Sequence, residues 1–365
     1  MSSRLKGIAR IVFFAVDFLV FSAMLSKNTK RIALVAVALA ISDLVRLPTF
    51  GGFNATGWKF GGSLAVSILV MLLGSWFSSH RRYGAFVLLV LALAVLNLHY
   101  GYRSQVAVDL VTVVFTLPIL PRAFARGNSA ANDRIRAAVL LFCSAGALWA
   151  AQKAIHEAAK FGAFEDSVEA KFEQQSSGKL GVLIGARPEI PVSLRAIADA
   201  PVLGHGSYAT DPKYAILLQE YQYKYGYSES DAPDEDLGAG IPTHSHLTGA
   251  WVDGGVLASL LWLYLLWQIV RAAVVISSKR PTLSPLYAFL FITFFWDILF
   301  SPFGYDRRIY ESVFIVLLID LTAKPTAKQL GRLRTYYVRR VYSGVPNSVP
   351  ASRLIGSRSG SYRSL

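Results

Sequence analysis

Long apolar runs separated by short polar segments recur along this chain of 365 residues. Nine runs approach the roughly 20 apolar residues that a helix needs to cross a bilayer. Their bounds, read to within several residues, are 10–26, 32–47, 63–78, 84–100, 105–121, 136–154, 254–276, 284–302 and 309–323. Each run is expected to be helical, because lipid offers no hydrogen-bond partner to free backbone groups. The pattern predicts an all-α, polytopic transmembrane helical bundle of about nine spans with one large, mostly helical loop.

The composition agrees with a membrane protein. Hydrophobic residues make up 53% of the chain and charged residues only 16%, whereas soluble domains carry about 25% charged residues. This balance excludes a soluble globular enzyme and a disordered chain. A disulfide scaffold is excluded as well, because Cys143 is the single cysteine and lies in an apolar run.

The first apolar run resembles a signal peptide, because Arg4, Lys6 and Arg10 precede its core. However, the run contains Asp17, and no small-residue cleavage site follows it. We therefore expect a retained helix.

The basic residues favour one orientation of these spans. With the C-terminal tail in the cytoplasm, most Lys and Arg residues of the short segments fall on the inner side, as the positive-inside rule requires. Nine spans then place the N-terminus outside, so either the first run does not fully cross or the rule is broken there. The predicted parts are N-terminal membrane helices (1–154), a large outer loop (155–253), C-terminal membrane helices (254–323) and a basic disordered tail (324–365).

The net charge of +14 has a topological explanation. Basic residues concentrate in the inner loops and the tail, whereas the segment 155–253 has more acidic than basic residues. Membrane lipids with anionic headgroups are the expected counter-charge. Nucleic acid is not an expected partner.

Candidate chemistry lies on the outer side. Arg187 precedes a proline at the head of the apolar-periodic stretch SLRAIADA, which also contains Arg195, and Arg103 lies where the fourth and fifth runs meet. His244 stands just before the seventh run. Convergence of Arg103, Arg187 and His244 would give a cationic pocket, suited to phosphate, with one titratable base. Taken singly, each arginine is more often a snorkelling anchor or a turn residue.

Two neighbouring motifs are weaker. Gly204-His205-Gly206 would expose backbone N–H groups if it formed a phosphate-cradling turn, although His205 is more often an ordinary loop histidine. His246, with His244 and either His205 or Asp253, would supply the three ligands of a catalytic zinc. The chain lacks an HExxH helix and a cysteine ligand pair, so no metal is expected. Ser245 has no nucleophile-elbow context either.

The stretches ARPEIPVSLRAIADAPVLGHGS and PTHSHLTGAWVDGGVLASLLWLYLL together resemble the O-antigen ligase and Wzy-type polysaccharide polymerase superfamily. The hallmark of that family is an arginine before a short helix ending in Pro-x-x-Gly-x-Gly. A His-Asn or His-Ser motif then comes about eleven residues ahead of a glycine that opens the next span. Here Pro201, Gly204 and Gly206 fit the first part, and His244 stands eleven residues before Gly255. The resemblance covers roughly 95–275, where YRSQVAVDL also looks like the family's Ser-Arg motif with the order reversed.

The resemblance implies a bacterial inner-membrane glycosyltransferase whose large loop is periplasmic. Such an enzyme transfers a glycan from an undecaprenyl-diphosphate carrier to an acceptor glycan or lipid, as polymerase or ligase, in surface polysaccharide biosynthesis. The resemblance implies that no cofactor is needed. It also implies a chain-length regulator and a flippase as further partners. Carried over by position, Arg103 and Arg187 would bind the diphosphate and His244 would be the catalytic base. The residues His246, His205, Arg195 and Asp253 would have supporting roles only.

A different class of protein fits the same composition. A non-catalytic transporter of polysaccharide or lipid-linked sugar would depend on acids within the spans, of which Asp17, Asp109 and Asp297 are candidates. Such a protein is expected to show inverted repeats and interrupted helices, and no convincing pair is evident.

Overall fold

The computed structural model describes residues 3–25, 28–118, 187–224, 240–304 and 307–323, with isolated positions between 135 and 157. Within them every regular element is helical, apart from an isolated bridge between Thr210 and Gly240. The α-helices are α1 (Ser3–Leu25), α2 (Thr29–Arg46), α3 (Ala55–Gly57), α4 (Ser63–Ser79), α5 (Tyr83–His99), α6 (Arg103–Thr116), α11 (Glu189–Asp199), α12 (Pro212–Lys224), α13 (His246–Lys279), α14 (Ser284–Phe300) and α15 (Arg308–Thr322). A 3₁₀ turn, η1 (Leu47–Phe50), follows α2, and a π-helical turn, η2 (Trp58–Gly62), precedes α4.

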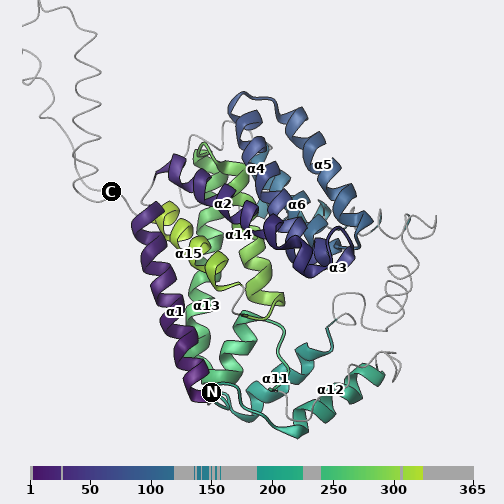
Figure 1. Ribbon diagram of the computed structural model, residues 1–365, viewed down its shortest axis with the longest axis vertical. Helices are drawn as coiled ribbons and strands as arrows, with labels where there is room; N and C mark the ends of the chain where they lie inside the picture. Colours follow the sequence, from purple (N-terminus) through teal and green to yellow (C-terminus); the bar gives the residue numbers. More distant parts are fainter. Residues whose placement is uncertain are drawn as a thin grey trace, which may run out of the picture. The chain divides into compact units, whose positions relative to one another are not determined.

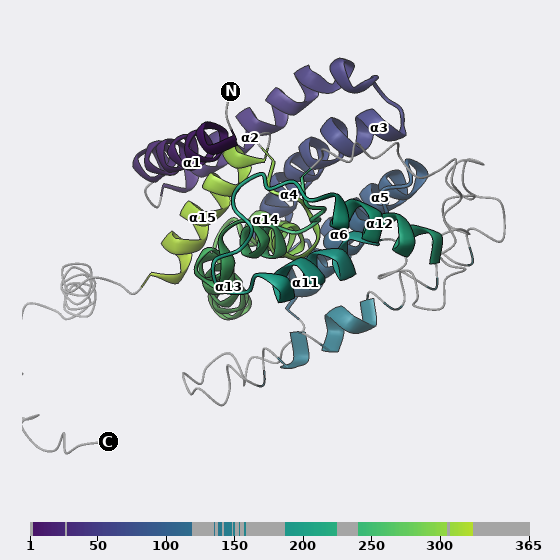
Figure 2. The same cartoon turned by 90° about the horizontal axis from the view of Figure 1, so that it is seen from below.

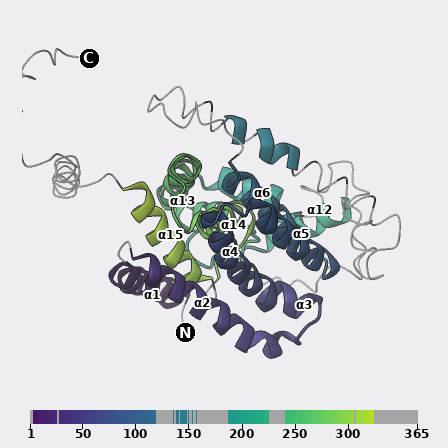
Figure 3. The ribbon, with the colours of Figure 1, turned by 90° about the horizontal axis from the view of Figure 1, so that it is seen from above.

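Helix α14 lies in the middle of the bundle and contacts α4, α6, α13 and α15 (Figures 1 and 3). Its side chains are almost entirely apolar, and Phe289 and Phe294 are fully buried against residues of the surrounding helices such as Trp262 and Phe314. A helix that is apolar on all sides is expected in the interior of a bundle. The sequence pattern therefore explains the central position of α14.

Eight of the nine predicted apolar runs coincide with helices of the described part of the chain. The sixth, 136–154, is described only in part, and its described positions, among them 138–140 and 142–147, are helical. The predicted tail 324–365 and the loop segments 158–186 and 225–239 lie outside the described residues. Among the described residues, four helical segments are long and apolar enough to cross a membrane: Leu5–Leu25, Thr29–Phe50, Ala55–Ser79 and His246–Lys279. The described part of the chain is thus all-helical, with four candidate membrane-spanning helices. The count of nine spans stays a prediction.

The outward faces of the long helices are apolar. Large hydrophobic side chains are exposed on α1 and α13, among them Ile11, Leu19, Leu257 and Trp267. A water-soluble surface does not keep such continuous apolar helix faces uncovered. The exposed faces are therefore compatible with a lipid environment.

A buried network of polar side chains joins η2, α4, α5 and α6. The carboxamide oxygen of Asn97 accepts from Trp58 Nε1 at 2.8 Å and from Ser63 Oγ at 2.7 Å, and its nitrogen donates to Asp109 at 2.8 Å. Gln105 also donates to Asp109, at 3.3 Å. These contacts satisfy polar groups that lie away from solvent. They also fix both ends of η2, the turn that carries Lys59.

Helices α11 and α12 lie together at one end of the bundle, where α13 begins (Figure 2). Val192 and Ala196 of α11 pack with Tyr214, Leu218 and Val252 in a small separate apolar core. The N-terminal end of α1 lies at this same end, because Arg10 forms an ion pair with Asp253 at 2.8 Å.

Candidate functional site

The Pro-x-x-Gly-x-Gly turn after α11 interlocks with a kink in α13. Gly204, Gly206 and Gly255 all have positive φ, a conformation that glycine adopts without strain. A Cβ on Gly255 would stand only 1.9 Å from the carbonyl oxygen of Val202, so the two backbones touch. The N–H of Val256 donates to the carbonyl of Pro201 at 3.1 Å across this contact. The glycine spacing seen in the sequence therefore serves a close backbone approach.

The expectation that Gly204-His205-Gly206 cradles a phosphate is wrong. The N–H of Gly204 donates to the Ala200 carbonyl at 3.1 Å, that of His205 to Val252 at 2.7 Å, and that of Gly206 to Asp253 at 3.0 Å. Each N–H is thus already bound within the protein. The turn anchors α11 to α13, and these three N–H groups are not available to an anion.

Side chains of the arginine motif and of the histidine motif both bind the C-terminal end of α14. Ser245 Oγ donates to the Ile298 carbonyl at 3.0 Å, and Arg187 Nη1 donates to the Phe300 carbonyl at 2.6 Å. The last carbonyls of a helix have no partner within the helix, so they accept readily from such side chains. The arginine motif and the histidine motif are thereby brought to one place.

His244 lies at this place, partly exposed at 39% of its side chain, with Nδ1 3.8 Å from Glu189 Oε1. Burial, and then the positive charges of Arg187, Lys59 and Arg307, lower the pKa of its imidazole to about 4. The imidazole is therefore neutral at pH 7. Three cations from three separate segments thus act on it electrostatically.

Arg187 keeps its charge in this setting. Burial lowers the pKa of its guanidinium, while the charges of Glu189, Tyr102 and Asp297 raise it. Its guanidinium carbon lies 5.6 Å from the ring centre of Phe300. One N–H of Nη1 donates to the Phe300 carbonyl. A guanidinium has five N–H donors, so Arg187 has further donors that could bind an anion.

Arg307 approaches from the segment before α15. It forms an ion pair with the buried carboxylate of Asp297 on α14. Burial alone would lower the pKa of Arg307, but Asp297, Tyr102 and Glu311 raise it, so the residue stays cationic. Burial and the charge of Asp297 in turn raise the pKa of the Tyr102 phenol.

Sequence reasoning missed four members of this group: Lys59, Tyr102, Glu189 and Arg307. All lie in segments that the charge distribution assigns to the outer side, which was the available signal. Arg103 follows Tyr102 at the start of α6, and burial lowers the pKa of its guanidinium. Convergence of Arg103 itself with Arg187 and His244 stays a prediction.

His246 differs sharply from His244, although only Ser245 separates them. It is fully buried, with Nδ1 2.6 Å from the Ser301 carbonyl and Nε2 2.8 Å from Glu311 Oε1. The ring also packs edge-on against Trp262, with centroids 4.9 Å apart. His246 therefore fastens α13 to α14 and α15, which makes it a positioning residue.

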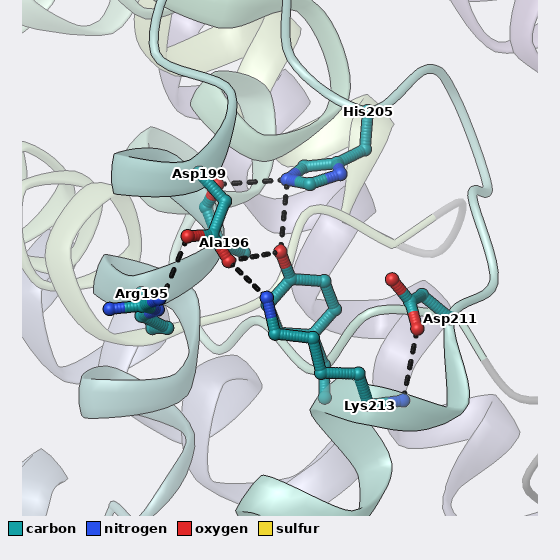
Figure 4. A network of polar contacts seen from close by, with 7 residues as sticks. Arg195, Ala196, Asp199, His205, Asp211 and Lys213 are labelled. Carbon is teal, nitrogen blue, oxygen red and sulfur yellow. Dashed lines mark hydrogen bonds and ion pairs between the residues drawn. The ribbon is translucent and has the colours of Figure 1, made fainter.

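The remaining supporting candidates lie in the contacts of α11 and α12 (Figure 4). His205 Nε2 is 2.8 Å from the Ala196 carbonyl, and Arg195 pairs with Asp199 at 3.2 Å. Asp253 pairs instead with Arg10 of α1. His205 and Asp253 thus link separate segments, whereas the Arg195 pair lies within α11. None of these contacts involves His244.

The possible zinc ligands are held in different environments. His246 is bound to Ser301 and Glu311, His205 to Ala196 and Asp253 to Arg10. Among the residues that the structure describes, no three His, Cys, Asp or Glu side chains gather as metal ligands.

The acids that a transporter would use have specific partners. Asp17 pairs with Arg308 at 2.5 Å, and Asp297 pairs with Arg307. Asp109 accepts from the amides of Asn97 and Gln105. Two of the three acids thus join helices through ion pairs.

Comparison of the chain with protein-family models, with curated proteins and with solved structures finds no match.

Proposed function

We propose that this chain is an inner-membrane glycosyltransferase that transfers a glycan from an undecaprenyl-diphosphate carrier to an acceptor glycan or lipid. Its place would be in surface polysaccharide biosynthesis, as polymerase or ligase, with the large loop periplasmic and with nine spans. The observation that supports this most strongly is the meeting of both motifs at the C-terminal end of α14, where Ser245 and Arg187 bind its carbonyls and His244 lies 3.8 Å from Glu189. Burial and the positive charges of Arg187, Lys59 and Arg307 keep the imidazole of His244 neutral there. A base among cations, at one end of an apolar bundle, suits a lipid-linked anionic leaving group.

The reaction needs two things that this group of residues offers. The acceptor oxygen forms a bond to the anomeric carbon while the bond from that carbon to the phosphate oxygen breaks, and the electron pair leaves with the diphosphate. Charge grows on the leaving group, so fixed cations stabilise the transition state more than the ground state. Arg187 and Arg307 would take this role together with Lys59, and Arg103 is proposed as a further diphosphate ligand.

The acceptor hydroxyl must lose its proton as it attacks. The Nδ1 of His244 faces Glu189, so the carboxylate would orient the ring and leave Nε2 to accept the proton. A bound diphosphate would neutralise the positive field and return the pKa of His244 toward its ordinary value. Donor binding would thus make His244 a stronger base. A base and a leaving group on opposite faces of the sugar would invert the anomeric centre.

The alternative is a non-catalytic transporter of polysaccharide or lipid-linked sugar. A transporter would use the same cations, Arg187, Lys59 and Arg307, to bind the diphosphate. It would not need a proton acceptor there. A substitution at His244 therefore separates the two functions.

The test compares His244→Ala with His80→Ala, a control at the far end of α4. Both variants are reconstituted with lipid-diphosphate-linked glycan, and product chain length is followed by gel electrophoresis. We expect His244→Ala to insert normally and to lose glycan transfer by roughly 100-fold or more, since a general base typically contributes at least that factor. His80→Ala should transfer as the unaltered protein does. Full transfer by His244→Ala would remove the base assignment and favour the transporter.

A further inference from the structure

The turn 201–203 presents apolar side chains to its surroundings. The side chains of Val202 and Leu203 are 62% and 80% exposed. The turn is nevertheless fixed, because the Pro201 carbonyl accepts from the Val256 N–H at 3.1 Å and from Trp251 Nε1 at 2.9 Å. The two side chains are thus held outward by a backbone that is tied to α13.

This turn borders the start of an apolar helix face. The Val202 carbonyl lies against Gly255, at the kink of α13. Just beyond the kink, Leu257 is 71% exposed, and it begins a face of exposed apolar residues that continues through Leu260, Leu261, Tyr264 and Trp267. The segment His246–Lys279 is long and apolar enough to cross a membrane. The exposed side chains of the turn therefore extend a surface that lipid is expected to cover.

We propose that the turn 201–203 inserts into the outer leaflet and holds α11 at the membrane surface. The partner is the lipid itself, with acyl chains around Val202 and Leu203. Trp251 lies beside the turn, and tryptophan is enriched at the level of the headgroups. Continuity with the α13 face favours lipid over a protein partner. The insertion rests on membrane crossing by α13 and not on the transferase activity.

The insertion has a consequence for the candidate site. Helix α11 begins at Glu189, beside Arg187 and His244. A turn anchored in the leaflet at the other end of α11 would hold these residues near the headgroups, where a lipid-linked phosphate lies.

The test uses a fluorescent probe on single cysteines, in a background in which Cys143, the one native cysteine, is replaced by alanine. The probe is placed at Leu203→Cys, with Leu257→Cys as the lipid-facing reference and Glu220→Cys as the water-facing reference on α12. The proteins are reconstituted in nanodiscs whose phosphatidylethanolamine and phosphatidylglycerol carry brominated acyl chains. We expect quenching at Leu203→Cys to match Leu257→Cys and to exceed Glu220→Cys several-fold.

A second probe position, Val202→Cys, keeps the test independent of any one variant, and iodide serves as a water-soluble quencher. Quenching by iodide at both turn positions, without quenching by brominated lipid, would overturn the proposal. Protection from both quenchers would also overturn it, since a protein surface would then cover the turn. Either result would leave the transfer assay of His244 unaffected.

Discussion

His244 carries an imidazole that stays uncharged well below neutral pH. Burial, and then the positive charges of Arg187, Lys59 and Arg307, lower its pKa to about 4, while 39% of the side chain is exposed. The same shift costs stability in acid. The unfolded chain binds this proton near the ordinary pKa, so the folded state loses stability as the pH falls from that value toward 4.

Arg187 is the residue whose chemistry is least replaceable. It donates to the Phe300 carbonyl, lies over an aromatic ring and acts electrostatically on His244. Lysine keeps the charge but lacks the planar fork and its several donors.

We therefore expect Arg187→Lys to lower kcat/KM for glycan transfer by roughly tenfold or more, since one strong donor to the leaving group is displaced. Arg195→Lys, the same change at an exposed position of α11, is the matched control and should have little effect. Initial rates of transfer by the reconstituted protein measure both. An unchanged rate in Arg187→Lys would mean that Arg187 only shapes the end of α14.

At the scale of elements, the interlock of the turn 201–206 with the kink of α13 sets the position of the site. Both backbones approach so closely that neither Gly204 nor Gly255 has room for a side chain. The N-cap Ser245, whose hydroxyl accepts from the Thr248 N–H at 3.0 Å, then begins α13 at His246. His244 is left just outside the helix and His246 is inside it.

Gly255→Ala is accordingly expected to lower the free energy of unfolding by about 2–4 kcal/mol, through positive-φ strain and backbone overlap. Gly84→Ala, in α5 with nothing within 4 Å of the added Cβ, should change it by about 1 kcal/mol or less. Thermal unfolding in detergent compares the two variants. Equal melting temperatures would contradict the interlock.

The elements themselves were more predictable than their contacts. Apolar runs predicted the eight long apolar helices of the described part but not α3, α11 or α12 as spans, and the glycine and histidine spacing pointed to the residues of the turn and the kink. The partners of the Gly204-His205-Gly206 N–H groups were not predictable, because those partners lie on α13, far along the chain. Lys59 and Arg307 were missed for the same reason, since only packing brings them to His244. The Ser245 cap could have shown that α13 begins eight residues before the predicted span.

At the scale of the whole molecule, contacts between helix ends show which segments lie at the same end of the helical bundle. Gly7 of α1 lies against Ser207, and Arg10 pairs with Asp253 and stacks over Tyr208. Helix α1 is also long and apolar enough to cross a membrane. Its N-terminal end and the described part of the large loop, residues 187–224 and 240–253, therefore lie at one end of the bundle. An acidic partner compensates Arg10, one of the three basic residues that the positive-inside rule would place inside.

We expect Lys6→Cys and Tyr208→Cys to react with a membrane-impermeant maleimide from the outer side. Arg81→Cys, in the turn between α4 and α5 at the opposite end, should react only after permeabilisation. Labelling of sealed right-side-out membranes, with Cys143 replaced by alanine, measures all three. Reaction of residues 6 and 208 from opposite sides would contradict the arrangement.

The central proposal is that a diphosphate binds beside a neutral His244, where the positive charges of Arg187, Lys59 and Arg307 act. Its most direct test is a pH titration of the His244 imidazole by ¹⁵N NMR, with and without a short-chain prenyl diphosphate. We predict a pKa of about 4 in the free protein, and a clearly higher pKa when the diphosphate is bound, since the anion offsets the charges of Arg187, Lys59 and Arg307. A titration at the ordinary imidazole pKa, unchanged by the diphosphate, would contradict the account.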